Sequence, residues 1–129
     1  MEAKQDKPLS PLSMGVLTQA LDEEGRYDAA KLAALLDWTN QEIARYLGKD
    51  PSTISRFSAS LQYQEPLAEL AAIFNHLVSL MDGDLRLARA WLRTPIRVLD
   101  GVSPKEKILH SDLKPIETLL QEVESGFSV

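Results

Sequence analysis

The sequence predicts an all-α protein, in which an N-terminal helix-turn-helix domain is followed by a small helical domain. Apolar residues recur at intervals of three and four residues in several segments, which is the spacing of one face of an α-helix. Glycine, proline and aspartate residues separate these segments, at positions that start and stop helices. We predict three parts: a mobile tail over 1–11, the helix-turn-helix domain over 12–63 and the second helical domain over 64–129.

The helix-turn-helix is predicted in the segment 38–61, as two short helices joined by a turn. Thr39 and Glu42 have the spacing of a capping box, in which each side chain accepts a hydrogen bond from the other residue's backbone amide. They predict a helix over 40–47, and Gly48 is placed to end it. A residue without a Cβ atom adopts the left-handed conformation needed there at low cost.

Asp50 and Pro51 predict the start of the second helix, because aspartate caps free amides and proline needs no amide partner in the first turn. Small Ala44 allows the two helices to cross closely, and Leu47 and Ile54 are expected to fill the angle between them. The polar residues on the outer side could then enter a DNA major groove, with a purely structural helix pair as the alternative. The predicted DNA-binding residues are Asn40, Gln41, Ser52, Thr53, Ser55 and Arg56.

The charge distribution bears on this prediction, because DNA attracts basic surfaces. The chain has a net charge of −5, whereas the segment 38–63 carries +1, from three basic and two acidic residues. A monomer of this kind would bind DNA weakly. We therefore expect a homodimer or a larger complex, which would bind two half-sites on the DNA at once.

The sequence argues against several classes of function. Without cysteine, the chain can form neither disulfides nor thiolate zinc sites. It has two histidines, no glycine-rich phosphate loop and no plausible serine–histidine–aspartate set, so we expect no catalytic residue, no metal site and no cofactor. The N-terminus lacks the continuous apolar segment of a secretory signal, and no run reaches membrane-spanning length. We expect a cytoplasmic protein without a membrane partner.

The most regular amphipathic pattern in the chain follows a predicted link over 62–65. Pro66 is placed as a helix starter, and the apolar stripe after it could connect the two halves or form a dimer seam. The stripe consists of Leu67, Leu70, Ala71, Phe74, Leu77, Val78 and Met81. His76 lies in the same helix and is interpreted as a partly buried structural residue rather than a ligand.

The remaining sequence predicts three further helices. In the segment 85–93, apolar residues lie on one side and a row of arginines on the other, at spacings of three and four. The row consists of Arg86, Arg89 and Arg93, and it is a solvated face or a surface for phosphate or an acidic partner. Ser103 is expected to cap a short helix, and the last helix, ended by Gly126, has an apolar stripe of Leu113, Ile116, Leu120 and Val123.

A pattern in the second half resembles that of a known family. Ala90-Trp91-Leu92 and Pro95 are followed by Leu99 and Gly101, by Pro104 with Ile108-Leu109, and by the closing helix. This spacing is similar to that of the toxin-binding domain of the Xre/MbcA/ParS antitoxin family, whose usual arrangement places an Xre-like helix-turn-helix ahead of it. The chain departs from the family before the last helix, where the family often has a glycine and this sequence has His110-Ser111-Asp112-Leu113.

The resemblance implies an antitoxin of a type II toxin–antitoxin pair. Its partner would be a RES-domain toxin, an NAD-consuming enzyme similar to ADP-ribosyltransferases, whose active site the C-terminal region would cover. The helix-turn-helix would bind operator DNA and so autoregulate the operon. The toxin-binding residues implied by position are Arg86, Arg89, Trp91, Pro95, Leu113, Glu117, Leu120, Glu124, Phe127 and Val129. The alternative is a stand-alone helix-turn-helix transcription regulator whose C-terminal half dimerises or senses a ligand.

Overall fold

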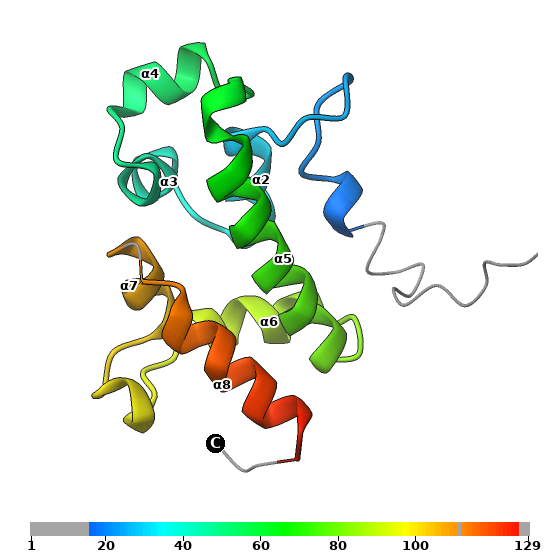
Figure 1. The fold of residues 1–129 in the computed structure, drawn as a ribbon, viewed down its shortest axis with the longest axis vertical. Coiled ribbons are helices and arrows are strands. Elements are labelled where there is room, and N and C mark those ends of the chain that lie inside the picture. Colours follow the sequence, from blue (N-terminus) through cyan, green and yellow to red (C-terminus); the bar gives the residue numbers. More distant parts are fainter. Residues whose placement is uncertain (1–15, 111, 127–129) are drawn as a thin grey trace, which may run out of the picture.

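The computed structural model describes residues 16–110 and 112–126, and Figure 1 shows this part of the chain as helices joined by turns. The elements in chain order are α2 (Ala29–Leu36), α3 (Asn40–Leu47), α4 (Pro51–Arg56), the 3-10 turn η2 (Leu61–Tyr63), α5 (Gln64–Leu80), α6 (Leu85–Leu92), the 3-10 turn η3 (Arg97–Leu99), α7 (Pro104–Leu109) and α8 (Lys114–Glu124). Within the described residues, extended pairing is limited to two isolated bridges. The prediction of an all-α protein is confirmed. The predicted tail over 1–11 lies outside the described residues.

The caps of the predicted helix-turn-helix are confirmed. The backbone amide of Glu42 donates to the Thr39 hydroxyl at 3.1 Å, and that of Thr39 donates to the Glu42 carboxylate at 2.9 Å. Gly48 ends α3 in the left-handed region, with φ of 69°. Asp50 caps α4, accepting a hydrogen bond from the amide of Ser52 at 3.2 Å, and Pro51 occupies the first helical position. Hydrogen bonds within four residues therefore define both ends of the turn.

The link predicted over 62–65 is wrong. Residues Leu61–Tyr63 form η2, and α5 begins at Gln64, two residues before Pro66. A helix tolerates proline anywhere in its first turn, since the amides there have no partner within the helix. Tyr63, expected in the link, is buried in the core instead. Proline therefore marked the first turn of α5 and not its first residue.

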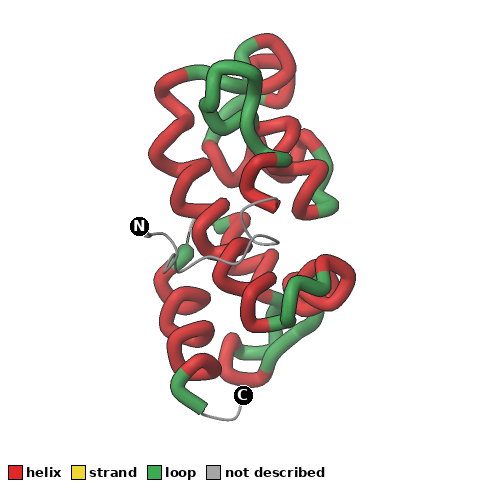
Figure 2. Tube along the Cα trace, turned by 90° about the vertical axis from the view of Figure 1, so that its right-hand side faces the viewer, coloured by secondary structure: helices red, strands yellow, loops and turns green. Residues whose placement is uncertain are grey.

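Helix α5 is the structural axis of the molecule. In Figure 1 it runs between two groups of helices, with α2, α3 and α4 around one end and α6, α7 and α8 around the other. Figure 2 shows the helical chain from the side, after a turn of 90°. Helix α5 contacts α2, α6 and α8. The predicted apolar stripe of α5 is buried except for Met81, which is half-buried against the core. Buried residues from both halves form one hydrophobic cluster, so the burial of this stripe holds the two groups of helices together.

Short local signals also define the helices of the C-terminal half. The Asp84 side chain caps α6 through the amide of Leu87 at 3.2 Å, and the Ser103 hydroxyl caps α7 through the amide of Glu106 at 3.2 Å. The turn between η3 and α7 has two consecutive residues in the left-handed region, Asp100 with φ of 62° and Gly101 with φ of 80°. This turn brings α7 back toward the N-terminal half, where it packs on α3.

Candidate DNA-binding and partner-binding surfaces

Helices α3 and α4 meet through small and fully buried side chains. Ala44 on α3 and Ile54 on α4 are both buried, and Leu47 is half-buried against the same core. The two helices contact each other as the sequence predicted, because Ala44 leaves room for the close approach. The remaining side of α4 therefore faces outward.

Five of the six residues predicted to bind DNA are exposed, and Thr53 is half-buried. Asn40 and Gln41 lie in the first turn of α3, and the other four lie on α4. The Ser52 hydroxyl donates to the Asp50 carboxylate, so it takes part in the cap of α4. The Arg56 guanidinium lies 5.9 Å from the centre of the Phe57 ring, within the range of a cation–π contact. The six residues are thus at the surface of two adjacent helices.

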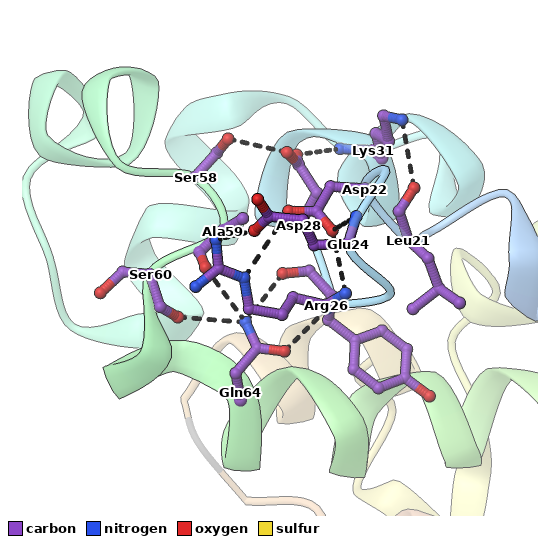
Figure 3. A network of polar contacts seen from close by, with 11 residues as sticks. Leu21, Asp22, Glu24, Arg26, Asp28, Lys31, Ser58, Ala59, Ser60 and Gln64 are labelled. Atoms are coloured by element: carbon purple, nitrogen blue, oxygen red, sulfur yellow. Dashed lines mark hydrogen bonds and ion pairs between the residues drawn. The ribbon is translucent and has the colours of Figure 1, made fainter.

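The loop after α4 is fixed to the start of α2 (Figure 3). The Asp28 carboxylate accepts hydrogen bonds from the amide of Lys31 at 3.0 Å and from the Ser58 hydroxyl at 2.9 Å. The carbonyl of Ser58 accepts a further bond from the amide of Ala29 at 2.8 Å. One aspartate therefore caps α2 and also fixes the chain that leaves α4.

Gln64 completes this attachment, and sequence reasoning missed its role. Its carboxamide accepts a hydrogen bond from the amide of Tyr27 at 2.7 Å and donates to the carbonyls of Tyr27 at 2.9 Å and Ser60 at 3.0 Å. These bonds join the first residue of α5 to a loop 37 positions earlier in the chain. No local spacing predicts such a pairing. Gln64 therefore ties the loop before α2 to the chain that leaves α4.

A shallow hollow of about 400 Å³ lies beside the end of α4. It is lined by Arg26, Arg56, Phe57, Ser58, Ala59 and Ser60. The guanidinium of Arg26 is paired with the Glu24 carboxylate at 2.6 Å and lies 3.8 Å from that of Asp22. A backbone amide hydrogen bond from Arg26 holds the pKa of Asp22 below its usual value. The lining of the hollow thus consists of the Phe57 ring, the polar loop over 58–60 and two arginines.

The arginine row on α6 is divided between structural contacts and solvent. Arg86 is exposed, whereas the Nε of Arg89 donates to the carbonyl of Leu35 at 2.8 Å. Arg93 lies 3.4 Å from the carboxylate of Asp37 at the end of α2. Arg89 and Arg93 therefore link α6 to the end of α2. A second hollow of about 400 Å³ lies at this junction, lined by Asp37, Arg86, Leu87, Arg89, Ala90 and Arg93.

The other predicted toxin-binding residues are placed in three ways. Pro95 and Glu124 are exposed, and Trp91, Leu113 and Glu117 are half-buried. Leu120 is only 1% exposed, so its side chain belongs to the core and is not at the surface for a partner. Leu120 belongs to the apolar stripe of the last helix, and this position is compatible with either burial or contact with a partner. In the structure it is buried. Phe127 and Val129 lie outside the described residues.

His76 and Glu124 connect α5 to the end of α8. The Nε2 of His76 lies 2.8 Å from a carboxylate oxygen of Glu124, and the imidazole is partly buried. This agrees with the interpretation of His76 as a partly buried structural residue. A shallow hollow of about 320 Å³ next to this pair is lined by Ala72, Ile73, His76, Glu117, Leu120 and Gln121.

A partly buried ion pair joins α3 to α7 in the C-terminal half. The ammonium of Lys105 on α7 lies 2.8 Å from the Glu42 carboxylate and 6.0 Å from the centre of the Trp38 ring. Burial of the Glu42 carboxyl acts to raise its pKa and is the largest single effect. Hydrogen bonds from Lys105 and from the amide of Thr39 outweigh burial together, so the pKa lies below its usual value. Sequence reasoning assigned Glu42 to the capping box only.

Tyr46 forms another connection, from α3 to the start of α5. Its hydroxyl donates to the carbonyl of Pro66 at 2.8 Å, and burial is the main reason that the pKa of Tyr46 is raised. Within the described residues, no three histidine, cysteine or acidic side chains form a group that could hold a metal ion. No helix in that part of the chain is long and apolar enough to span a bilayer.

Comparison with known proteins defines the class of fold. No protein-family profile and no curated protein matches the sequence. Among solved structures, an all-α chain with an antitoxin-like fold is similar to this one over 94% of this chain and 100% of that chain, with a TM-score of 0.60 and 18% sequence identity. It belongs to the crystal structure of the M. tuberculosis MbcT–MbcA toxin–antitoxin complex. At this identity the likeness shows that the two chains share a fold.

Proposed function

We propose that this protein is an antitoxin that binds a RES-domain toxin through its C-terminal half and operator DNA through α3 and α4. The observation that carries the proposal is the extent of the structural likeness, which covers 94% of this chain and the whole of a chain from a toxin–antitoxin complex. A shared helix-turn-helix alone would cover only part of the chain. The RES-domain identity of the toxin rests on the sequence pattern from Ala90 to Gly126.

The proposed toxin-binding surface consists of the predicted residues that the fold leaves accessible. Arg86 and Pro95 are exposed on or after α6, and Glu124 is exposed at the end of α8. Arg89, Trp91, Leu113 and Glu117 contribute their exposed parts. Phe127 and Val129, which lie outside the described residues, are included in the proposal as toxin contacts. Neutralisation by covering an active site requires shape and charge from this chain, and no chemical step.

The proposed DNA-binding surface consists of Asn40, Gln41, Ser52, Thr53, Ser55 and Arg56. Hydroxyl and amide side chains at the start of a helix can donate to phosphates and base edges in a major groove, and an arginine can bind a guanine at two points. The surface carries little net charge, so affinity depends on two copies bound side by side. Binding of this kind would allow the toxin–antitoxin complex to repress its own operon.

Co-expression with the product of the neighbouring gene, which the proposal expects to be a RES-domain toxin, tests the antitoxin role. The full chain should restore growth, and a chain truncated after Gly126, which keeps all of α8, should neutralise less well because Phe127 and Val129 are lost. Truncation after Asp112 should abolish neutralisation, but it also removes the buried residues Ile116, Leu119 and Leu120. Circular dichroism must therefore accompany that variant.

The outcomes separate the antitoxin from its alternative. Full neutralisation by the chain truncated after Gly126 would show that the last residues do not occlude the toxin's active site. It would not contradict the rest of the proposed toxin-binding surface. Failure of the full chain to bind the toxin, with promoter binding intact, would identify a stand-alone transcription regulator instead. Substitution of Glu117 by lysine, on the half-buried face of α8, provides a full-length variant that reverses one charge of the proposed surface.

A further inference from the structure

Three arginines from α6 and its C-cap gather around one hollow of the surface. The hollow of about 400 Å³ between α6 and the end of α2 is lined by Asp37, Arg86, Leu87, Arg89, Ala90 and Arg93. Three arginines against one aspartate give the lining a net charge of +2, whereas the whole chain carries −5. The hollow is therefore a local concentration of positive charge on an acidic protein.

The helical spacing explains why the hollow is open. Arg86, Ala90 and Arg93 follow each other at intervals of four and three positions, so their side chains lie along one side of the helix. Alanine contributes only a methyl group between two long side chains, and space remains beside it. At 1.5 Å per residue, Arg86 and Arg93 are separated by about 10 Å along the axis, which leaves room for a side chain of a partner.

The three arginines differ in how far their charge is already used. The Nε of Arg89 donates to the carbonyl of Leu35 at 2.8 Å, so this residue has a structural role. Arg93 lies 3.4 Å from the carboxylate of Asp37, and the two side chains are 51% and 70% exposed. An ion pair as exposed as this one contributes little stability. Arg86 is exposed and has no hydrogen-bond or ion-pair partner among the described residues, so Arg86 and Arg93 are both accessible to a further carboxylate.

An exposed apolar side chain lies in the same lining. Leu87 is 53% exposed, and it offers an apolar contact among the arginines. A partner that covers it removes apolar surface from water, which stabilises a complex. Arginine is enriched in protein–protein interfaces, where its head binds a carboxylate and its stem packs against apolar groups. The hollow therefore matches a protein surface that presents an acidic side chain beside an apolar one.

A nucleic acid matches the hollow less well. A DNA backbone presents a continuous row of phosphates and no apolar group at its surface for Leu87. In Figure 1, α6 lies at the end of α5 away from α4, which carries four of the six proposed DNA-binding residues. These two observations favour a protein as the partner.

We propose that the hollow between α2 and α6 is a binding site for an acidic side chain of the toxin. The carboxylate enters beside Ala90 and pairs with Arg86 and with Arg93, and an apolar neighbour of the acidic residue covers Leu87. Arg93 exchanges its exposed pair with Asp37 for the new one. The proposal rests on the antitoxin role proposed above, and it specifies the chemistry that the toxin presents to α6.

Calorimetric titration with the product of the neighbouring gene, the expected toxin, tests this site in the full chain. Arg86→Glu should raise the dissociation constant by about tenfold or more, because a like charge replaces an opposite one. Ala90→Leu fills the hollow without changing its charge, keeps a good helix former and should also raise the dissociation constant by about tenfold or more. The matched control is Arg97→Glu, which reverses an exposed arginine of η3 outside the hollow and should bind as the unchanged chain does. Circular dichroism should show that all three variants are folded.

Two further measurements identify the partner group as a carboxylate. The affinity of the unchanged chain should fall more steeply with added NaCl than that of Arg86→Glu, because the variant has lost an ion pair that salt screens. Toxin variants in which single aspartates or glutamates are changed to lysine are then combined with Arg86→Glu. At least one of them should restore binding, since it again places opposite charges together. If none restores binding, the partner group is not a carboxylate and the proposal is overturned.

The outcomes separate this site from the proposed function. If the unchanged chain binds the toxin and neither Arg86→Glu nor Ala90→Leu weakens the complex, the site is overturned and the antitoxin role stands. An equal loss for Arg97→Glu would indicate general attraction between charged surfaces and would also overturn the site. Loss of promoter binding by Arg86→Glu, with toxin binding unchanged, would assign the hollow to DNA phosphates instead. Failure of the unchanged chain to bind the toxin would overturn both proposals.

Discussion

The carboxylate of Glu42 lies 2.8 Å from the ammonium of Lys105, and this pair joins α3 to α7 in the C-terminal half. Glu42 also completes the capping box of α3, so one side chain serves the start of a helix and the contact between two groups of helices. Both side chains are mostly buried, which strengthens the pair relative to one in open solvent. Any movement of α7 would therefore act directly on the start of α3.

Removing this ion pair should lower stability. For Lys105→Met we expect a loss of about 1–2 kcal/mol in the free energy of unfolding at neutral pH, because the Glu42 carboxylate loses a charged hydrogen-bond donor. Chemical denaturation followed by circular dichroism measures the change. Lys114→Met is the control. Lys114 is exposed, so this substitution should change the free energy of unfolding very little. Equal stability of the two variants would contradict a role for the pair.

The same pair predicts an acid dependence of stability. The pKa of Glu42 in the folded chain is lowered from its usual value of 4.5, so its stabilising contribution is complete above that value. The contribution is lost as the pH falls through the lower folded pKa, because the unfolded chain then binds more protons. The difference in unfolding free energy between the unchanged chain and Lys105→Met should therefore shrink below about pH 4.5. A constant difference across that range would contradict the prediction.

Gly48 should resist substitution for a backbone reason. Its φ of 69° lies in the left-handed region, and an added Cβ would meet no atom within 4 Å. Gly48→Ala should therefore cost about 1 kcal/mol from conformation alone, seen as a lower midpoint of thermal unfolding. Gly48→Asn should cost less, since asparagine adopts this conformation more readily. An alanine variant as stable as the unchanged chain would rule out a conformational requirement at this turn.

Arg56 should contribute to promoter binding. If its side chain reads a base, Arg56→Ala should weaken binding by about 1–3 kcal/mol in a gel-shift titration at fixed salt. Lys114→Ala removes the same charge from α8, at the other end of the molecule, and should have a small effect. Circular dichroism should show that the variant is folded, so that a loss of binding is due to the side chain. Unchanged promoter binding would mean that Arg56 is not a reader.

Two arginines on α6 should behave differently. Arg89→Ala should lower the free energy of unfolding by about 1–2 kcal/mol, because it removes a charged donor from the carbonyl of Leu35. Arg86 is exposed, and Arg86→Ala should change stability by less than about 0.5 kcal/mol. Calorimetric titration with the toxin should show weaker binding for both. Toxin affinity unaffected by Arg86→Ala would remove Arg86 from the proposed surface.

Local signals predicted the starts of several helices correctly. Thr39, Asp50 and Ser103 each cap the helix that follows, as predicted, through an amide two or three residues away. The apolar stripe of α5 was also predicted from its spacing. These features depend on hydrogen bonds and side-chain directions within one or two helical turns, which the sequence displays directly.

The candidate surfaces were predicted less completely. Leu120 and the surface residue Glu117 belong to the same helix, and spacing alone could not say which of them the core would cover. Arg89 belongs to a row that looks uniform in sequence, yet it bonds to a carbonyl 54 positions earlier. The exposed pair of Phe57 and Leu61 also became visible only when the path of the chain after α4 was known.

The sequence by itself determined an all-α chain, the caps at Thr39, Asp50 and Ser103, and the turn between α3 and α4. Only the tertiary structure decided that Gln64 fixes the loop after α4, that Lys105 meets Glu42, and that Leu120 is buried. Caps and turns are completed by neighbours in the chain, so residue order is sufficient to predict them. Contacts between distant residues depend on how whole helices pack around α5, and that packing is a property of all the buried side chains together.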